Sequence, residues 1–220
     1  MTGAAPPDRR QRRRRETIEQ VLDVAAEVMA EQGVAGLTLG EVARRMGIRP
    51  PSLYVYFDGK NALYDALFER GWRELGSAMA AVETALDPTD PAAAVLAYTS
   101  AFVRWAVEHP AFAPLMFWRP VPGFTPSEAA YRPAVETTGR GRDLLAELQR
   151  RGALRADADL DLAFRTVTAL TTGVISQQLA NGPGEPFETG AFTSTLPVVI
   201  AMWSSQFAVP GPAHPPEESP

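Results

Sequence analysis

The sequence predicts an all-α protein, and three observations lead to this prediction. Apolar residues recur three and four places apart through most of the 220 residues, which is the spacing of one helix face. No stretch of any length alternates apolar and polar residues as a half-buried strand does. Residues 37–60 hold two short helical patterns separated by a turn at Gly47, which is the spacing of a helix-turn-helix unit. We therefore expect a three-helix head, a long fourth helix and a helical remainder.

Composition excludes several kinds of site. The chain is 45% hydrophobic and 21% charged, as is ordinary for a globular protein. It has no cysteine, which excludes disulfides, thiolate catalysis and cysteine metal sites. Its two histidines, His109 and His214, lie far apart, and no nucleophile motif, glycine-rich phosphate loop or metal-spaced cluster is present. We therefore expect no metal, no cofactor and no enzyme activity.

No apolar run approaches the ~20 residues that span a membrane. The first residues also lack the apolar stretch of a secretory signal. A cytoplasmic protein without a membrane partner is the simplest interpretation.

The net charge of −5 hides an uneven distribution. Residues 1–60 contain ten Lys and Arg against eight Asp and Glu, whereas residues 61–220 contain eleven against eighteen. Six arginines lie within residues 9–15, and this block of like charge predicts that residues 1–15 form a disordered arm. Two interpretations stay open for it: a contact with DNA phosphates or a minor groove, or a solvated tail.

The head is expected over residues 16–62. Its first helix, residues 16–32, ends at Gly33, since glycine suits the position after a helix. Thr38 and Glu41 form a capping box at the start of the second helix, which Gly47 ends.

A third helix is expected to start at Pro50 and Pro51, because proline is tolerated in the first turn of a helix. Leu53 and Phe57 are four residues apart and are expected to pack inward. The opposite side of this helix carries Pro51, Ser52 and Val55, flanked by Tyr54 and Tyr56. Not all of these aromatic side chains are needed to form a core.

The remaining helical patterns fill residues 63–208, which we expect to form one ligand-binding and dimerisation domain. They cover residues 61–86, 92–109, 111–118 and 127–150, a segment that begins at Asp157 or Asp159, and residues 188–207. A break is expected near Gly139. The last two patterns are apolar around much of their circumference, which requires a partner surface besides the core. Residues 209–220 are proline-rich and are expected to be disordered.

Two strings in the head, VARRMGI and SLYVYFDGKNAL, carry a family resemblance. With the first helix ending in EQGVAGLTL, they resemble the TetR family of bacterial transcriptional regulators over residues 16–67. The strings AVEHPAFAPLMF and ALTTGVISQQL are similar, more loosely, to the subgroup with a WHG-type ligand domain.

The resemblance implies a homodimer whose two heads bind a palindromic operator in double-stranded DNA. It also implies that a small-molecule effector bound in the C-terminal domain releases the DNA, and that the protein is a repressor. A regulator that answers to a protein, or to no ligand, stays open as an alternative.

Matching positions imply two sets of DNA contacts. The residues expected at phosphates are Thr38, Ser52, Tyr56 and Lys60. Those expected at base edges are Arg49, Pro50, Pro51, Tyr54 and Val55. The chemistry agrees, because hydroxyls and lysine suit phosphates and arginine can bind guanine through two hydrogen bonds. Many relatives have a small capping residue in place of Arg49, so for this residue a phosphate contact stays open beside guanine.

Two further sets are expected in the C-terminal domain. The ligand-pocket residues are Trp105, Met116, Phe117, Trp118, Tyr131 and Thr171, and ordinary core packing is the alternative for the aromatics. The residues expected at the dimer interface are Leu170, Val174, Gln178, Leu196, Val199 and Trp203.

Overall fold

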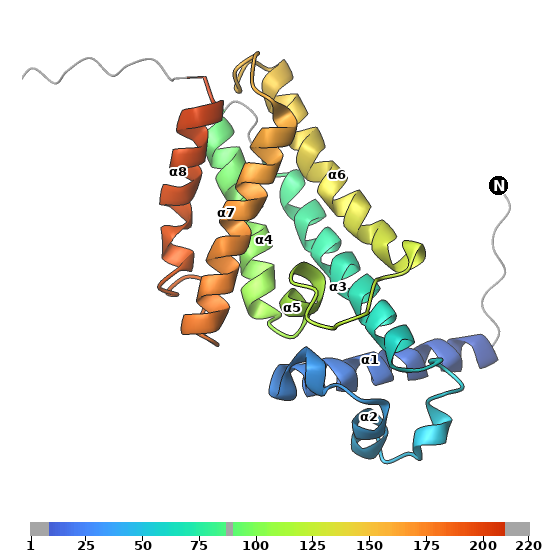
Figure 1. Cartoon of the computed structure of the whole chain (residues 1–220). Helices are drawn as coiled ribbons and strands as arrows, with labels where there is room; N and C mark the ends of the chain where they lie inside the picture. Colours follow the sequence, from blue (N-terminus) through green and yellow to red (C-terminus); the bar gives the residue numbers. More distant parts are fainter. Residues whose placement is uncertain (1–8, 87–89, 210–220) are drawn as a thin grey trace, which may run out of the picture. The chain divides into compact units, whose positions relative to one another are not determined.

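A computed structural model of the protein describes residues 9–86 and 90–209 (Figure 1). The all-α prediction is confirmed, since these residues form helices and no strand. The helices are α1 (Arg9–Gly36), α2 (Leu39–Arg45), α3 (Lys60–Glu83), α4 (Pro91–Glu108), α5 (Phe112–Phe117), α6 (Glu128–Arg150), α7 (Leu160–Asn181) and α8 (Leu196–Phe207), with 3-10 turns η1 (Pro50–Ser52) and η2 (Thr193–Thr195). No helix in these ranges is long and apolar enough to cross a membrane.

The chain divides into two compact units, each built from two segments. The head unit comprises the described residues up to Arg73 together with His109–Pro133. The body unit comprises Glu74–Glu108 and the described residues from Ala134 onward. The division therefore falls inside α3 and inside α6, and α5 belongs with the head unit.

Helix α1 begins at Arg9, so the arginine block is helical, contrary to the expected disordered arm. Arginine is a good helix former, and extending a helix that is already anchored at Val21 and Leu22 avoids the cost of nucleation. The rest of the expected arm, residues 1–8, and the expected tail from residue 210 lie outside the described residues. Gly33 has φ +72° and interrupts the helix, as its position predicted.

The segment after Gly47 that comprises residues 49–56, which we call the reading turn, differs from the expected third helix. It is a single 3-10 turn, closed by the Leu53 N–H donating to the Pro50 carbonyl at 3.0 Å, and plain turns follow up to Tyr56. The two prolines have no N–H to donate to a helical hydrogen bond. One hydrogen bond of α-helical spacing is present, from the Phe57 N–H to the Leu53 carbonyl at 2.9 Å. The segment is too short to add more turns of α-helix.

Aromatic pairs join the first half of α3 to the later segment of the head unit. Tyr64 contacts Phe124 with ring centroids 5.4 Å apart, and Trp72 meets Phe117 edge-on at 5.8 Å. The Met116 side chain of α5 packs directly on Gly71, because a Cβ on Gly71 would lie 2.6 Å from the Met116 sulfur. This packing explains why the two segments form one unit.

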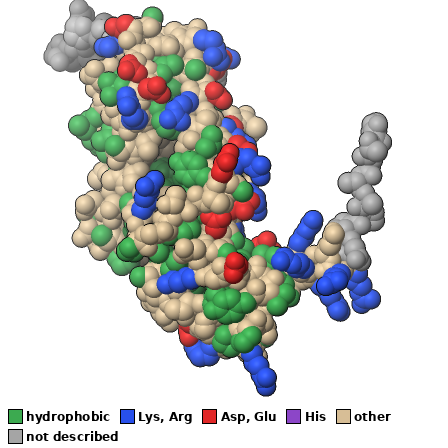
Figure 2. Space-filling model, turned by 45° about the vertical axis from the view of Figure 1, so that its right-hand side comes forward, with side chains coloured by type: hydrophobic (Ala, Val, Ile, Leu, Met, Phe, Trp, Pro, Cys, Tyr) green, Lys and Arg blue, Asp and Glu red, His purple; other side chains and the backbone are tan. Residues whose placement is uncertain are grey.

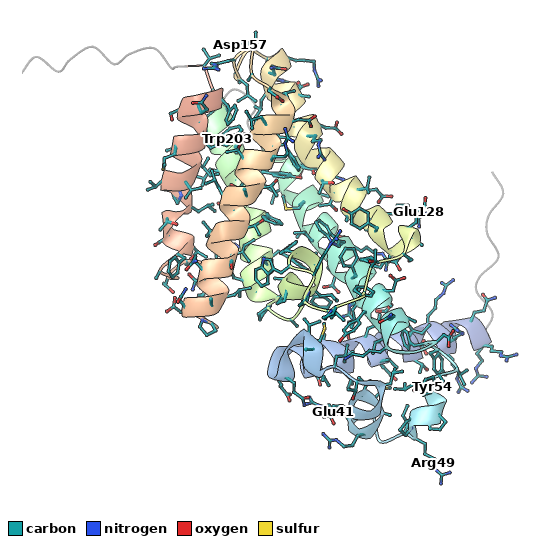
Figure 3. All side chains as sticks on the ribbon, viewed as in Figure 1. Glu41, Arg49, Tyr54, Glu128, Asp157 and Trp203 are labelled. Atoms are coloured by element: carbon teal, nitrogen blue, oxygen red, sulfur yellow. The ribbon has the colours of Figure 1, made fainter. Side chains whose placement is uncertain are left out.

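In the body unit, α4, α7 and α8 pack against one another. The indole Nε1 of Trp203 donates to the Ala163 carbonyl at 2.9 Å and fastens α8 to α7 (Figure 3). Asp159 caps α7 by accepting from the Leu162 N–H at 3.0 Å. Helix α6 continues through Gly139 without the expected break.

The last helix begins at Leu196, later than expected from the sequence. The buried side-chain oxygen of Gln178 accepts from the N–H groups of Phe192 and Thr193, at 2.9 and 3.2 Å. These bonds hold the segment before Leu196 in turns, so its first residues do not join the helix.

Candidate nucleic-acid interface

The reading turn is anchored by buried side chains and presents large side chains to solvent. Leu53 and Phe57 are buried in the head unit, as expected. Between them, Tyr54 is 57% exposed and Val55 is 71% exposed. The buried pair fixes the backbone, so the exposed pair is held outward in a defined position. A rigid apolar and aromatic surface of this kind suits contact with a partner.

Arg49 begins the turn with its side chain free of any capping bond. It has an extended backbone, with φ −78° and ψ 137°, and is exposed together with Pro50 and Pro51. Figure 3 shows its side chain pointing away from the helices. The turn thus offers a guanidinium donor beside apolar groups, which is a combination that can read base edges in a major groove.

The four residues expected at phosphates all belong to the head unit. Thr38 and Ser52 are exposed. The hydroxyl oxygen of Thr38 accepts from the Glu41 N–H at 3.1 Å, which leaves its own O–H available to donate. Tyr56 is half-buried beneath the guanidinium of Arg14, which lies 5.5 Å from its ring centroid.

Lys60 is already partly engaged within the head. Its Nζ donates to the Ala35 carbonyl at 3.2 Å and lies 5.2 Å from the ring centroid of Tyr64. The ammonium has three donors, so one bond to Ala35 leaves others for an anion. Lys60, the first residue of α3, is thus tied to the last turn of α1 through Ala35.

The expected capping box is only half present. Thr38 caps α2, but the Glu41 carboxylate accepts from Arg44 and Arg45 and does not return to the cap. Hydrogen bonds from Arg44 and then Arg45 lower the pKa of Glu41 from 4.5 to about 2. The signal for these ion pairs was in the sequence, because Glu41 lies three and four residues before the two arginines.

Arg45 extends this network to α1. It donates to Glu31 from both terminal nitrogens, and this bond is the main cause that lowers the pKa of Glu31. The positioning helix α2 is therefore held to α1 by charge-assisted bonds as well as by its apolar face.

The residues expected in a ligand pocket fall into both units. Met116, Phe117, Trp118 and Tyr131 belong to the head unit, whereas Trp105 and Thr171 belong to the body unit. Trp118 and Tyr131 are exposed, and Trp105, Met116 and Thr171 are buried. The Thr171 hydroxyl donates to the Val167 carbonyl at 2.8 Å in its own helix.

The sequence interpretation did not select Trp72. Its Nε1 is buried in the head unit and has no hydrogen-bond partner among the described residues. Nothing in a helical apolar pattern separates such an unpaired indole from ordinary core.

Four of the six residues expected at the dimer interface are buried in the body unit itself. They are Val174, Gln178, Leu196 and Trp203, each of which is at most 7% exposed. Leu170 and Val199 are half-buried and line a groove of about 400 Å³ on α7 and α8. Large apolar side chains are exposed on these helices: Leu162, Val198 and Met202.

Within the described ranges, no three His, Asp or Glu side chains are grouped so that they could hold a metal ion.

Comparison with protein families matches both parts of the chain. Residues 21–67 match the family described as bacterial regulatory proteins, tetR family. Residues 95–196 match the family described as tetracyclin repressor-like, C-terminal domain. Together the two matches cover about two thirds of the chain.

Individual relatives match over shorter stretches. An uncharacterized HTH-type transcriptional regulator, YobS of Bacillus subtilis (strain 168), is 32% identical over 96 residues, which are 44% of this chain and 49% of the relative. The tetracycline repressor protein class D of Escherichia coli is 45% identical over 49 residues, 22% of each chain. The chain thus spans about half or less of the length of these two relatives.

Solved structures extend the likeness to the whole fold. A protein of unknown function from Rhodococcus sp. RHA1 has a TM-score of 0.73 at 20% identity, covering 87% of this chain and 95% of that one. The ketosteroid transcriptional regulator KstR2 of Mycobacterium tuberculosis has a TM-score of 0.64 at 19% identity, covering 88% and 98%. At this identity the likeness concerns the fold alone.

Proposed function

This chain belongs to the TetR family and is a DNA-binding transcriptional regulator, and from this premise we propose that it is a ligand-released repressor. In this proposal a homodimer binds a palindromic operator through its two reading turns. A small molecule bound in the C-terminal domain then releases the operator.

One observation carries the DNA part of the proposal: Tyr54 and Val55 are held outward on a base of buried Leu53 and Phe57. We assign base-edge contacts to this turn, with Arg49 as the guanine-binding donor and Val55 against a thymine methyl. We assign phosphate contacts to Ser52 and Tyr56 of the same turn and to Thr38 and Lys60 outside it.

The homodimer is supported by the apolar surface of α7 and α8. Val198 and Met202 are 63% and 66% exposed, one helical turn apart. Large apolar side chains gathered on a helix pair mark a surface that a partner covers. A second copy of this chain is the partner that the family premise implies.

The effector is supported by the unpaired Trp72 indole. Its Nε1 has no acceptor among the described residues, and its ring lies against Phe117 and Phe68. A buried donor without a partner calls for a group that satisfies it. An effector with an apolar body and one hydrogen-bond acceptor fits these surroundings.

Selection from random duplexes with the full chain tests the DNA part. The expected result is a dyad-symmetric sequence with half-sites about 34 Å apart, or a multiple of one helical turn. A Tyr54→Ala, Val55→Ala double variant is the control, because it removes the exposed pair and leaves Leu53 and Phe57 in place. Enrichment of no sequence by the wild type would refute the proposal.

A thermal-shift screen of small apolar compounds tests the effector part. Because coupling between two sites is reciprocal, a true effector raises the melting temperature and also lowers operator affinity. A compound that raises the melting temperature without lowering operator affinity is not an inducer. If no compound did both, the alternative of a regulator without a small-molecule inducer would replace the effector part.

A further inference from the structure

The first two turns of α1 have no role in the core. Every residue from Arg9 to Glu16 is exposed, and the first buried residue of the helix is Val21. No acidic residue lies in the first turn, although the positive end of the helix dipole favours acids there. The arginines therefore lie at the end of the helix where positive charge is unfavourable. A bound anion would offset this charge.

Four of the arginines line one open groove. Arg9 and Arg13 lie one turn apart on this face, as do Arg10 and Arg14, and each pair spans about 6 Å at 1.5 Å per residue. The groove has a volume of about 710 Å³ and no carboxylate lines it. None of the four arginines forms an ion pair within the described residues. Figure 2 shows the cluster of Lys and Arg side chains at the start of α1.

The other side of the groove belongs to the reading turn. Thr17 of α1 and the turn residues Val55 and Tyr56 complete the lining, and all these residues are part of the head unit. Arg14 joins the two sides, since its Nη2 lies 3.5 Å from the Val55 carbonyl oxygen and its guanidinium lies over the Tyr56 ring. An anion in the groove is therefore a direct neighbour of the residues assigned to DNA.

We propose that this arginine groove is a second phosphate site, which holds the DNA backbone just outside the half-site that the reading turn contacts. The proposal rests on the proposed function. Guanidinium groups suit phosphates because they donate two parallel hydrogen bonds. Phosphates on one strand advance about 3.4 Å along the duplex axis, so the rise of about 6 Å between two arginines corresponds to about two phosphate steps. A row of this kind fits a continuous backbone better than one small anion.

The test compares two operator duplexes from the selection described above. One ends at the half-sites, and the other continues for one helical turn beyond each. Arg9→Gln with Arg13→Gln removes two groove cations. Arg12→Gln with Arg15→Gln is the matched control, because it removes the same charge from residues outside the groove, where Arg12 pairs with Glu16.

We expect the groove variant to bind the long duplex more weakly, with a loss on the order of tenfold. The slope of log affinity against log salt should fall by about 2, at about 0.9 for each phosphate that the variant no longer neutralises. On the short duplex the groove variant should bind as the wild type does, and the control should behave nearly as wild type on both. Both variants should keep the wild-type melting temperature, because these positions bury nothing.

Three results would overturn the proposal. Equal losses for groove variant and control would mean that only total charge matters. A groove-variant loss that is the same on both duplexes would place the contact inside the half-site. If the groove bound inorganic phosphate and the affinity for DNA did not depend on duplex length, the groove would be assigned to a small anion. Failure of the proposed function is distinct, because the wild type would then select no operator at all.

Discussion

Arg45 on α2 binds the carboxylate of Glu31 on α1 with both of its terminal nitrogens, one at 2.9 Å. The same guanidinium donates through Nε to Glu41, and its side chain is only 18% exposed. A planar fork held between two carboxylates fixes the position of α2 on α1. Only residues 46–48 separate α2 from Arg49, where the reading turn begins, so a displacement of α2 would also displace the turn.

The network predicts a pH-dependent stability. Arg44 and Arg45 lower the pKa of Glu41 from 4.5 to about 2. A carboxyl group with a lowered pKa adds stability above its ordinary pKa and loses it as the pH falls toward the folded value. The melting temperature of Glu41→Gln should therefore be below wild type at pH 7, and the difference should shrink between pH 4.5 and pH 2.

Glu27→Gln is the control, because Glu27 is an exposed carboxylate on the same α1. Its melting temperature should stay close to wild type across the same range. A difference for Glu41→Gln that is constant from pH 7 to pH 2 would contradict the assigned ion pairs.

The two DNA roles predict different outcomes for two cations of the head. Arg49→Ala should change the preferred base at one position of each half-site, at a cost of about 1–3 kcal/mol in discrimination. Lys60→Ala should weaken all sequences alike and lower the salt slope by about 1. Selection from random duplexes with each variant measures both. An unchanged consensus for Arg49→Ala would move this residue to the phosphates.

The apolar surface of α7 and α8 predicts the position of the dimer contact. Val198→Glu should produce monomers, measured by sedimentation at micromolar concentration, because it places a charge in the proposed interface. Val135→Glu makes the same change on α6, at a valine that is 57% exposed, and should leave the dimer intact. Dissociation by both variants, or by neither, would exclude α8 as the specific contact.

The unpaired indole predicts a selective effect on effector binding. Trp72→Phe keeps an aromatic ring beside Phe117 and removes the N–H. Effector affinity should fall about tenfold, as for the loss of one buried hydrogen bond, while operator affinity without effector stays at wild type. Isothermal titration with a compound found in the screen measures this. Tyr54→Phe is the control, since it removes an O–H from an exposed side chain that is assigned to DNA and not to the effector.

Features set by nearby residues could be predicted from the sequence. Thr38 and Ser127 cap their helices through the N–H three residues on, at 3.1 and 3.2 Å. Gly47 and Gly152 have positive φ where helices end. Such positions depend on a few neighbouring residues, so their residue types are enough to place them.

Features set by distant contacts could not be predicted in this way. The late start of α8 depends on Gln178, which is fourteen and fifteen residues from the N–H groups it binds. The arginine groove needs the reading turn as its second side, forty-one residues from Arg14. Spacing within one helix carries no information about either partner.

The dimer residues show a different limit. Periodicity identified α7 and α8 as apolar on more than one side. It could not say which side meets α4 in the same chain and which side is left open. Val174 and Trp203 proved to be buried, whereas Val198 and Met202 are exposed.

The two-segment head unit has a consequence for protein engineering. Sensor chimeras are commonly conceived as exchanges of a contiguous N-terminal piece, and the expected boundary after residue 62 would suggest such a cut. That cut would divide the head unit inside α3. A contiguous piece extended to Arg73 would still part Asp65 from Ser127, whose N–H and hydroxyl donate to the Asp65 carboxylate at 2.7 and 2.5 Å. A transplanted recognition module should therefore carry residues 109–133 with it, as a second graft, if it is to keep its native packing.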